Sequence, residues 1–264
     1  MTSRNPASVI TGPVISAPVA WAVLGLAVTE ALAVLLPLLA FDGQPNDDGV
    51  DLLISPAGYA FAIWAVIYVL AIAVGVVFVR KRMSGTGSAQ RLAIDLAITC
   101  GAATLWLIVS AASLDWLPSI LLTVMAAALF DAARIAAGPA DPNAPSWITT
   151  LVRITVGIYA GWASAAVFIN WAADLARSGI VDATSLGWQL AILIAAALYG
   201  VCVTFLVGAA LPAYPLTLVW ALLAIIVGAW TSSSAVVIVA VFGLVAVGLA
   251  YANSVRRPGG VAAA

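Results

Sequence analysis

The stretch GYAFAIWAVIYVLAIAVGVVFV, residues 58–79, decides the fold class of this chain. It contains no charged residue and is followed at once by Arg80, Lys81 and Arg82. A helix needs about 20 apolar residues to cross the hydrocarbon core of a bilayer, and in lipid every backbone polar group must be bonded within the segment. The stretch therefore predicts a membrane-spanning helix that ends at a basic loop.

The remainder of the chain has a similar composition. Hydrophobic residues make up 64% of the 264 residues and charged residues 8%, against about 45–50% and about 25% in a soluble domain. So few charges could not cover a surface that faces water. We therefore predict an all-α fold, a polytopic transmembrane bundle of about eight spans. The expected spans are residues 17–41, 58–79, 92–113, 116–138, 147–173, 186–207, 211–230 and 234–253.

The basic residues predict the orientation of the bundle. With the N-terminus in the cytoplasm, eight spans place every Lys and Arg except Arg177 on the inner side, which is the positive-inside pattern. Seven spans would put Arg256 and Arg257 outside. We expect a multi-pass protein of the plasma membrane with both termini cytoplasmic, and the composition and lack of an organellar presequence favour a prokaryotic source.

The last three spans are less aromatic than the first five, which suggests two parts within the membrane. We expect the first five spans to form a core and the last three to form an appended unit. The expected parts are a cytoplasmic tail at 1–16, a five-helix core at 17–176, a three-helix membrane unit at 177–254 and a second cytoplasmic tail at 255–264.

The residue types that are missing exclude several kinds of chemistry. The chain has no histidine, the commonest general base and metal ligand, so Ser-His or Cys-His catalysis, zinc sites and His-ligated haem are excluded. Cys100 and Cys202 both lie in apolar segments, where a thiol is usually a small core residue. The net charge of −1 does not suit nucleic acid, which binds a basic face. We expect no enzyme, no metal and no required cofactor.

Tryptophan is abundant, with ten in the chain. Those at span ends are typical of an aromatic belt at the membrane surface. Trp64, Trp106 and Trp162 lie deeper, where several rings around one cavity would suit a planar apolar ligand, although simple packing would also explain each. The belt residues are Trp116, Trp147, Trp188 and Trp230.

The second span begins with Pro56, and a proline is well tolerated at the start of a helix. Phe61 lies three residues before Trp64, and Tyr68 lies four after it. Residues three or four apart share one face of a helix. The second span is thus expected to present an aromatic face to the bundle.

The fifth span carries a similar face. Tyr159, Trp162, Ala166 and Asn170 follow at spacings of three, four and four, which form one continuous stripe. An asparagine within a span is costly unless it is hydrogen-bonded. Asn170 is therefore expected either to join two helices or to orient a ligand.

These faces resemble the second and fifth helices of the TspO/MBR family, the tryptophan-rich sensory proteins related to mitochondrial translocator protein. That family has a proline turn before a Trp and a Tyr four residues apart, a Trp in its third helix, and a fifth helix with Tyr, Trp and Asn at the same spacings as here. The similarity covers residues 17–176, and the last three spans resemble those of the longer prokaryotic members. The matching residues are Pro56, Trp64, Tyr68, Trp106, Tyr159, Trp162 and Asn170, with Tyr214, Pro215 and Trp220 in the last spans.

The resemblance implies a five-helix core that binds a tetrapyrrole such as porphyrin or haem, for sensing or transport. The chain departs from the family at Ser55, Gly58 and Ala62, where proline, an aromatic residue and proline are usual, and at Ala103, where asparagine is usual. The expected ligand-binding residues are Pro56, Phe61, Trp64, Tyr68, Trp106, Tyr159, Trp162 and Asn170.

Acidic residues within the spans form a second group of candidates. Glu30 lies midway along the first span, and an ionisable residue there is a functional hypothesis by default. It is either a proton-linked switch or a protonated side chain bonded to a neighbouring helix. Near the inner ends of the spans, Asp95 is expected to pair with Arg91, and Asp131 with Arg134.

Two other functions stay open at this point. The chain could be a small secondary transporter with Glu30 as its proton carrier, or an accessory subunit of a larger membrane complex, which the lack of catalytic groups suits. Runs of small residues at Ala126–Ala128 and Ala195–Ala197 allow helices to approach closely, which also leaves a homodimer open.

Overall fold

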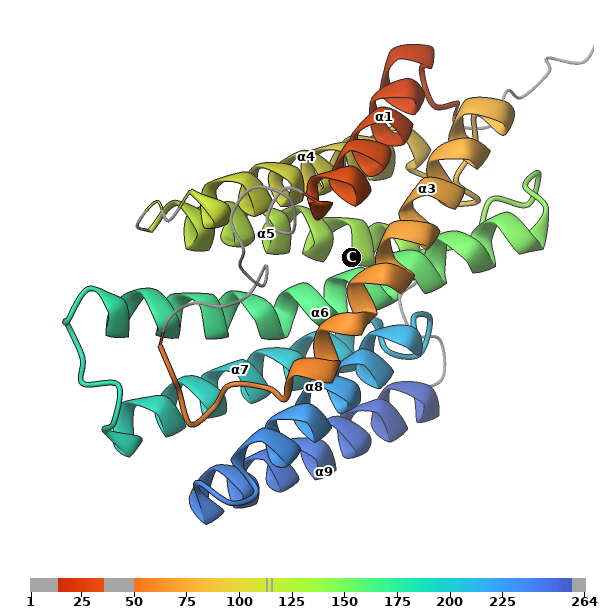
Figure 1. The fold of residues 1–264 in the computed structure, drawn as a ribbon. Helices are drawn as coiled ribbons and strands as arrows, with labels where there is room; N and C mark the ends of the chain where they lie inside the picture. Colours follow the sequence, from red (N-terminus) through yellow and green to blue (C-terminus); the bar gives the residue numbers. More distant parts are fainter. Residues whose placement is uncertain (1–13, 36–49, 113, 115, 258–264) are drawn as a thin grey trace, which may run out of the picture.

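The computed structural model describes residues 14–35, 50–112, 114 and 116–257. Within these ranges the chain is helical throughout, apart from its connections, and contains no strand, which confirms the all-α prediction (Figure 1). The elements are α1 (Ala17–Ala33), the 3-10 helix η1 (Gly58–Ala62), α3 (Ile63–Lys81), α4 (Ala89–Ala111), α5 (Leu117–Ala137), α6 (Ser146–Arg177), α7 (Leu186–Val207), α8 (Ala213–Ala229) and α9 (Ser234–Arg256).

Each expected span corresponds to a helix. Six helical segments of the described chain are long and apolar enough to cross a membrane, and α1 and α8 are shorter apolar helices. Each of these two has 17 residues, close to the lower limit of about 17 for a span. Large apolar side chains such as Phe242, 70% exposed, point outward, so the protein is a multi-pass membrane protein. The expected end of the first span, after residue 35, lies outside the described residues.

α6 is longer than the expected span 147–173, because it continues through Asp174 to Arg177. Asp174 is buried; it accepts a hydrogen bond from the Ser119 hydroxyl and pairs with Arg177 at 2.5 Å. Burying a charge is tolerated when it is paired and hydrogen-bonded. These polar residues therefore extend the helix.

Helix α6 lies in the middle of the bundle. In Figure 1 it runs between α4 and α5 on one side and α7, α8 and α9 on the other, with α3 crossing it, and it contacts α3, α5, α7 and α8. It packs tightly against α8. A Cβ atom at Gly161 would lie 2.7 Å from the Tyr214 carbonyl oxygen, and one at Gly157 would lie 2.9 Å from the Cβ of Ala213. Glycines four residues apart are a common device for bringing two membrane helices together.

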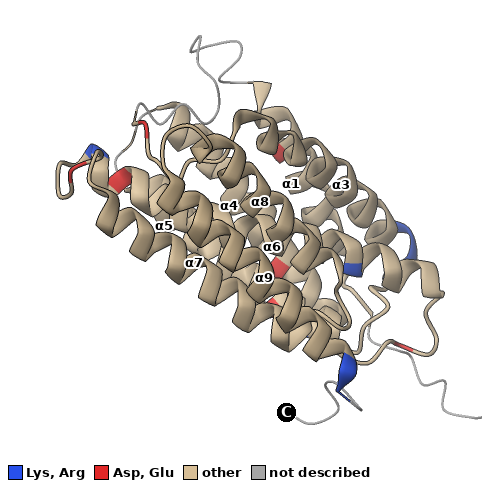
Figure 2. Ribbon diagram, turned by 90° about the horizontal axis from the view of Figure 1, so that it is seen from below, with Lys and Arg blue, Asp and Glu red and all other residues tan. Residues whose placement is uncertain are grey.

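Basic residues gather toward the end of the bundle where α3 and α9 finish, as Figure 2 shows. We call this the basic end. The two ion pairs expected from sequence spacing near it are wrong. Arg91 on α4 instead donates to both carboxylate oxygens of Asp131 on α5, at 2.7 and 3.0 Å. A contact between helices replaces the pairs of Asp95 with Arg91 and of Asp131 with Arg134.

Candidate functional site

Trp64, in the first turn of α3, lies at the centre of a cluster of aromatic rings. It is stacked at 23° with both Tyr68 and Trp106, with ring centroids 5.8 Å apart in each pair. Tyr159 and Trp162 approach Trp64 edge-on, at 6.0 and 6.3 Å. Offset stacks and edge-to-face pairs at about 4.5–7 Å are the favourable arrangements of aromatic rings. One set of rings thus joins α3, α4 and α6.

A cavity of about 40 Å³ lies beside these rings. Six of the eight residues expected to bind a ligand line it, whereas Tyr68 and Tyr159 contact the Trp64 ring from outside the lining. Its volume has room for about three water molecules, at roughly 10–15 Å³ each. We call it the aromatic cavity. The expected residues that line it are Pro56, Phe61, Trp64, Trp106, Trp162 and Asn170.

The aromatic cavity contains few polar groups. The Trp106 indole Nε1–H donates to Asn170 Oδ1 at 3.0 Å, so Asn170 does join α6 to α4, one of the two roles expected for it. The Trp162 ring is buried at 3% exposure, and its Nε1–H has no hydrogen-bond partner within the described structure. A buried donor without a partner is costly. A lining residue therefore carries a buried N–H group without an acceptor.

Two lining residues come from the last three helices and were missed from the sequence. Ala221 and Ile225 of α8 line the cavity together with Ala165, Ala166 and Ile169 of α6. Their spacing of four places them on one face of α8, but small and aliphatic residues at that spacing occur in every span. Because α8 forms part of the wall, the first five spans do not enclose the cavity alone. The division into a core and an appended unit stays a prediction.

The segment before α3 is held in place by α8. The backbone N–H of Ala57 donates to the carbonyl oxygen of Ala224 at 2.9 Å, and the Trp220 indole donates to that of Ala60 at 3.1 Å. A Cβ atom at Gly228 would lie 2.5 Å from the Ser55 carbonyl oxygen. α8 therefore sets the positions of Pro56 and Phe61 at the cavity.

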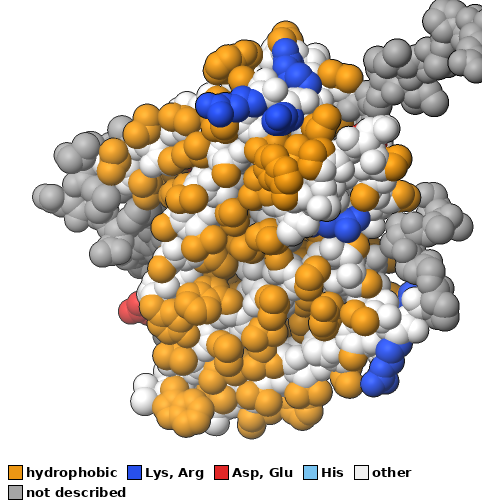
Figure 3. All heavy atoms as spheres, turned by 90° about the vertical axis from the view of Figure 1, so that its right-hand side faces the viewer, with side chains coloured by type: hydrophobic (Ala, Val, Ile, Leu, Met, Phe, Trp, Pro, Cys, Tyr) orange, Lys and Arg blue, Asp and Glu red, His pale blue; other side chains and the backbone are white. Residues whose placement is uncertain are grey.

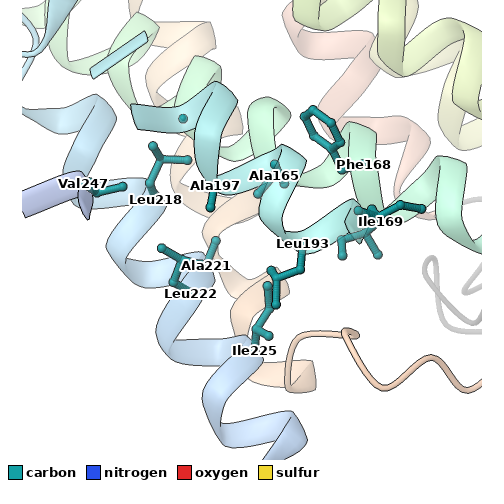
Figure 4. A pocket seen from close by; sticks show the side chains of 13 residues that line it. Ala165, Phe168, Ile169, Leu193, Ala197, Leu218, Ala221, Leu222, Ile225 and Val247 are labelled. Atoms are coloured by element: carbon teal, nitrogen blue, oxygen red, sulfur yellow. The ribbon is translucent and has the colours of Figure 1, made fainter. Parts of the chain in front are cut away.

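A second cavity, of about 30 Å³, adjoins the first. Figure 4 shows aliphatic side chains and Phe168 around it, from α6, α7, α8 and α9. Ala165, Ile169, Ala221 and Ile225 line both cavities. These four side chains border both spaces, so their movement would enlarge the aromatic cavity.

Glu30 does not line either cavity, but it is connected to the aromatic cluster. It is fully buried, and its Oε1 accepts a hydrogen bond from the Tyr159 hydroxyl at 2.6 Å. Its Oε2 has no hydrogen-bond partner, and no basic side chain of the described chain pairs with it. The Tyr159 ring lies edge-on against Trp64. A change in the hydrogen bond between Glu30 and Tyr159 would therefore alter the packing of the cavity wall.

The fold and this cavity define a class of protein, a multi-pass α-helical membrane protein with an internal aromatic cavity. Within that class, the chain belongs to the TSPO-like protein family, whose model matches residues 16–252. The match extends from the start of α1 nearly to the end of α9, so it includes the last three helices as well as the first five. No curated protein and no solved structure matches the chain.

Proposed function

We propose that this TSPO-like membrane protein binds a hydrophobic planar ligand, a tetrapyrrole such as porphyrin or a molecule of similar shape, in the aromatic cavity, and that it senses or transports this ligand. The observation that carries the proposal is the buried Nε1–H of Trp162, which lacks an acceptor, on a residue that lines a cavity walled by aromatic rings. Stacking on the rings would hold a flat ligand, and a ligand oxygen would accept from Trp162. The proposal includes binding and movement of the ligand, and no catalytic step.

A tetrapyrrole is larger than a cavity of about 40 Å³, so binding requires an opening movement. Two features support one. The side chains shared with the second cavity border two adjacent spaces, and the segment around Pro56 is joined to α8 only by the hydrogen bonds at Ala57 and Ala60, a ring contact of Tyr59 with Trp220 and packing at Gly228. We propose that this segment swings away from α8 to admit the ligand from the membrane.

The test is quenching of tryptophan fluorescence when the purified full chain is titrated with protoporphyrin IX. We expect saturable quenching, and Trp162→Phe should weaken binding roughly tenfold, because it keeps a ring but removes a hydrogen-bond donor worth about 1–2 kcal/mol. Trp230→Phe is the matched control, since Trp230 is 71% exposed and outside the cavity. Equal affinities of wild type and Trp162→Phe would show that the cavity is not the site.

A second function, proton-linked transport through Glu30, is favoured by the unpartnered Oε2 of this buried side chain. A carboxyl group inside a membrane bundle commonly takes part in a proton pathway, and Tyr159 connects Glu30 to the wall of the aromatic cavity. In liposomes that contain the protein, Glu30→Gln should abolish the dependence of porphyrin uptake on a pH gradient. Unaltered uptake would exclude this mechanism and leave binding intact.

A further inference from the structure

A large hollow lies at the basic end, away from the aromatic cavity. It measures about 770 Å³ and is bounded by the start of α4 and the C-terminal ends of α5, α7 and α9. We call it the basic cleft. Pockets that bind small molecules measure about 300–1,000 Å³, so its size suits the polar head of an amphiphile and the first part of a chain.

The charges in the basic cleft do not cancel. Arg91, Arg134 and Arg257 line it together with one acidic residue, Asp131. The ion pair of Arg91 with Asp131 neutralises one positive charge. Two arginines, Arg134 and Arg257, thus provide a net positive charge.

The arginines at this end differ in their partners. Arg153 donates to the carbonyl oxygens of Ala136 and Gly138, both at 2.9 Å, and so caps the end of α5. The side chain of Arg134 makes no hydrogen bond or ion pair with any described residue, and the guanidinium of Arg257 lies over the ring of Phe205, 3.5 Å from its centroid. A guanidinium without a carboxylate partner can donate hydrogen bonds to an anion.

Apolar groups form the other side of the cleft. Ile135, Phe205 and Val207 line it beside the arginines, and Leu206 is 53% exposed there. Figure 3 looks onto this end and shows basic side chains among a largely hydrophobic surface, with little acidic surface in view. Phe205, Leu206 and Val207 belong to the last turn of α7, which is part of an apolar span.

The helix ends at the cleft have opposing effects on an anion. Three C-terminal helix ends carry partial negative charge and disfavour it. The N-terminus of α4, whose N-cap residue Ser88 makes no side-chain capping bond, carries partial positive charge and borders the same cleft. The arginines therefore supply the larger part of the attraction.

From this arrangement we propose that the basic cleft binds an anionic phospholipid, with its phosphate between Arg134 and Arg257 and an acyl chain along Phe205 and Leu206. Guanidinium groups bind phosphate with two parallel hydrogen bonds, and basic pockets between spans are suited to lipid head groups. A free phosphate would use the arginines alone, whereas a lipid also uses the apolar side.

The experiment is native mass spectrometry of the full chain in detergent, titrated separately with dioleoyl phosphatidylglycerol, dioleoyl phosphatidylcholine and inorganic phosphate. We expect the anionic lipid to bind roughly tenfold more tightly than the zwitterionic lipid, as two basic residues near a lipid surface allow. The double variant Arg134→Gln/Arg257→Gln should lose most of this preference. Arg80→Gln/Lys81→Gln, the same charge change at the same end but outside the cleft lining, should keep it.

Three results would overturn the proposal. These are equal binding of the two lipids, an unchanged preference in the Arg134→Gln/Arg257→Gln variant, and inorganic phosphate binding as tightly as the anionic lipid. Arg134→Lys/Arg257→Lys retains both charges and is the control for misfolding as the cause of a lost lipid preference. It should recover part of the preference. Leu206→Asn should weaken binding of the anionic lipid and leave binding of inorganic phosphate unaffected.

Discussion

At the scale of single residues, the polar contacts of the site lie between helices that are distant in the chain. Asn170 illustrates this, because its side-chain Oδ1 accepts a hydrogen bond from the indole of Trp106, 64 positions earlier in the chain. Sequence spacing placed Asn170 on the same stripe as Trp162, but it could not name the partner. The pairing depends on how α4 and α6 pack, and the periodicity of residues along one helix gives no information on that packing.

Replacing Asn170 by Leu should destabilise the bundle by about 1 kcal/mol, since hydrogen bonds between membrane helices contribute about 0.6 kcal/mol on average and up to about 1.7, and the buried Trp106 donor loses its acceptor. The measurement is the free energy of unfolding in mixed micelles as the denaturing detergent fraction rises. A double-mutant cycle with Trp106→Phe isolates the contact. A coupling energy near zero would show that this bond does not stabilise the fold.

At the scale of helices, the sequence predicted the bundle well. Every expected span is a helix, because long apolar stretches in lipid leave the backbone little alternative. The predicted C-terminal end of α6 is one turn too early, because Asp174 and Arg177 are predicted as loop residues. The pairing of Asp174 with Arg177 and its hydrogen bond from Ser119 make helix continuation favourable, and the sequence alone does not reveal these contacts.

The contact between α6 and α8 holds two walls of the aromatic cavity together. Gly161→Val should force the helices apart, because a Cβ there would meet Tyr214 and Thr217 at 2.7 and 2.8 Å, and overpacking costs about 1–3 kcal/mol. Protoporphyrin binding and detergent resistance should both fall. Gly25→Val is the control, since nothing lies within 4 Å of its Cβ position. Comparable losses in the two variants would contradict a specific role for this contact.

At the scale of the whole molecule, the aromatic residues of the site could be predicted, and the wall from α8 could not. Spacings of three and four identified the faces with Trp64 and Trp162, and rings are rare enough to stand out. Ala221 and Ile225 have no distinguishing chemistry, so only the packed structure assigns them to the cavity. That placement leads to a prediction about the chain as a whole.

A chain cut between Gly179 and Ile180, in the connection between α6 and α7, should remain associated when the two fragments are produced together. The contacts of α6 with α7 and α8 hold the halves, and the fragment that ends at Gly179 should bind protoporphyrin poorly by itself because it lacks α8. Co-purification followed by fluorescence titration measures both. Full affinity of the first fragment alone would instead support a self-sufficient five-helix core.

The stacked rings of Trp64, Trp106 and Tyr68 also have a spectroscopic consequence. Indoles whose centroids lie 5.8 Å apart in a fixed relative orientation couple electronically and should produce a characteristic near-ultraviolet circular dichroism band, a signal that depends on tertiary packing and disappears when packing loosens while helices persist. The protein therefore carries its own optical reporter of the state of its interior, readable without any label.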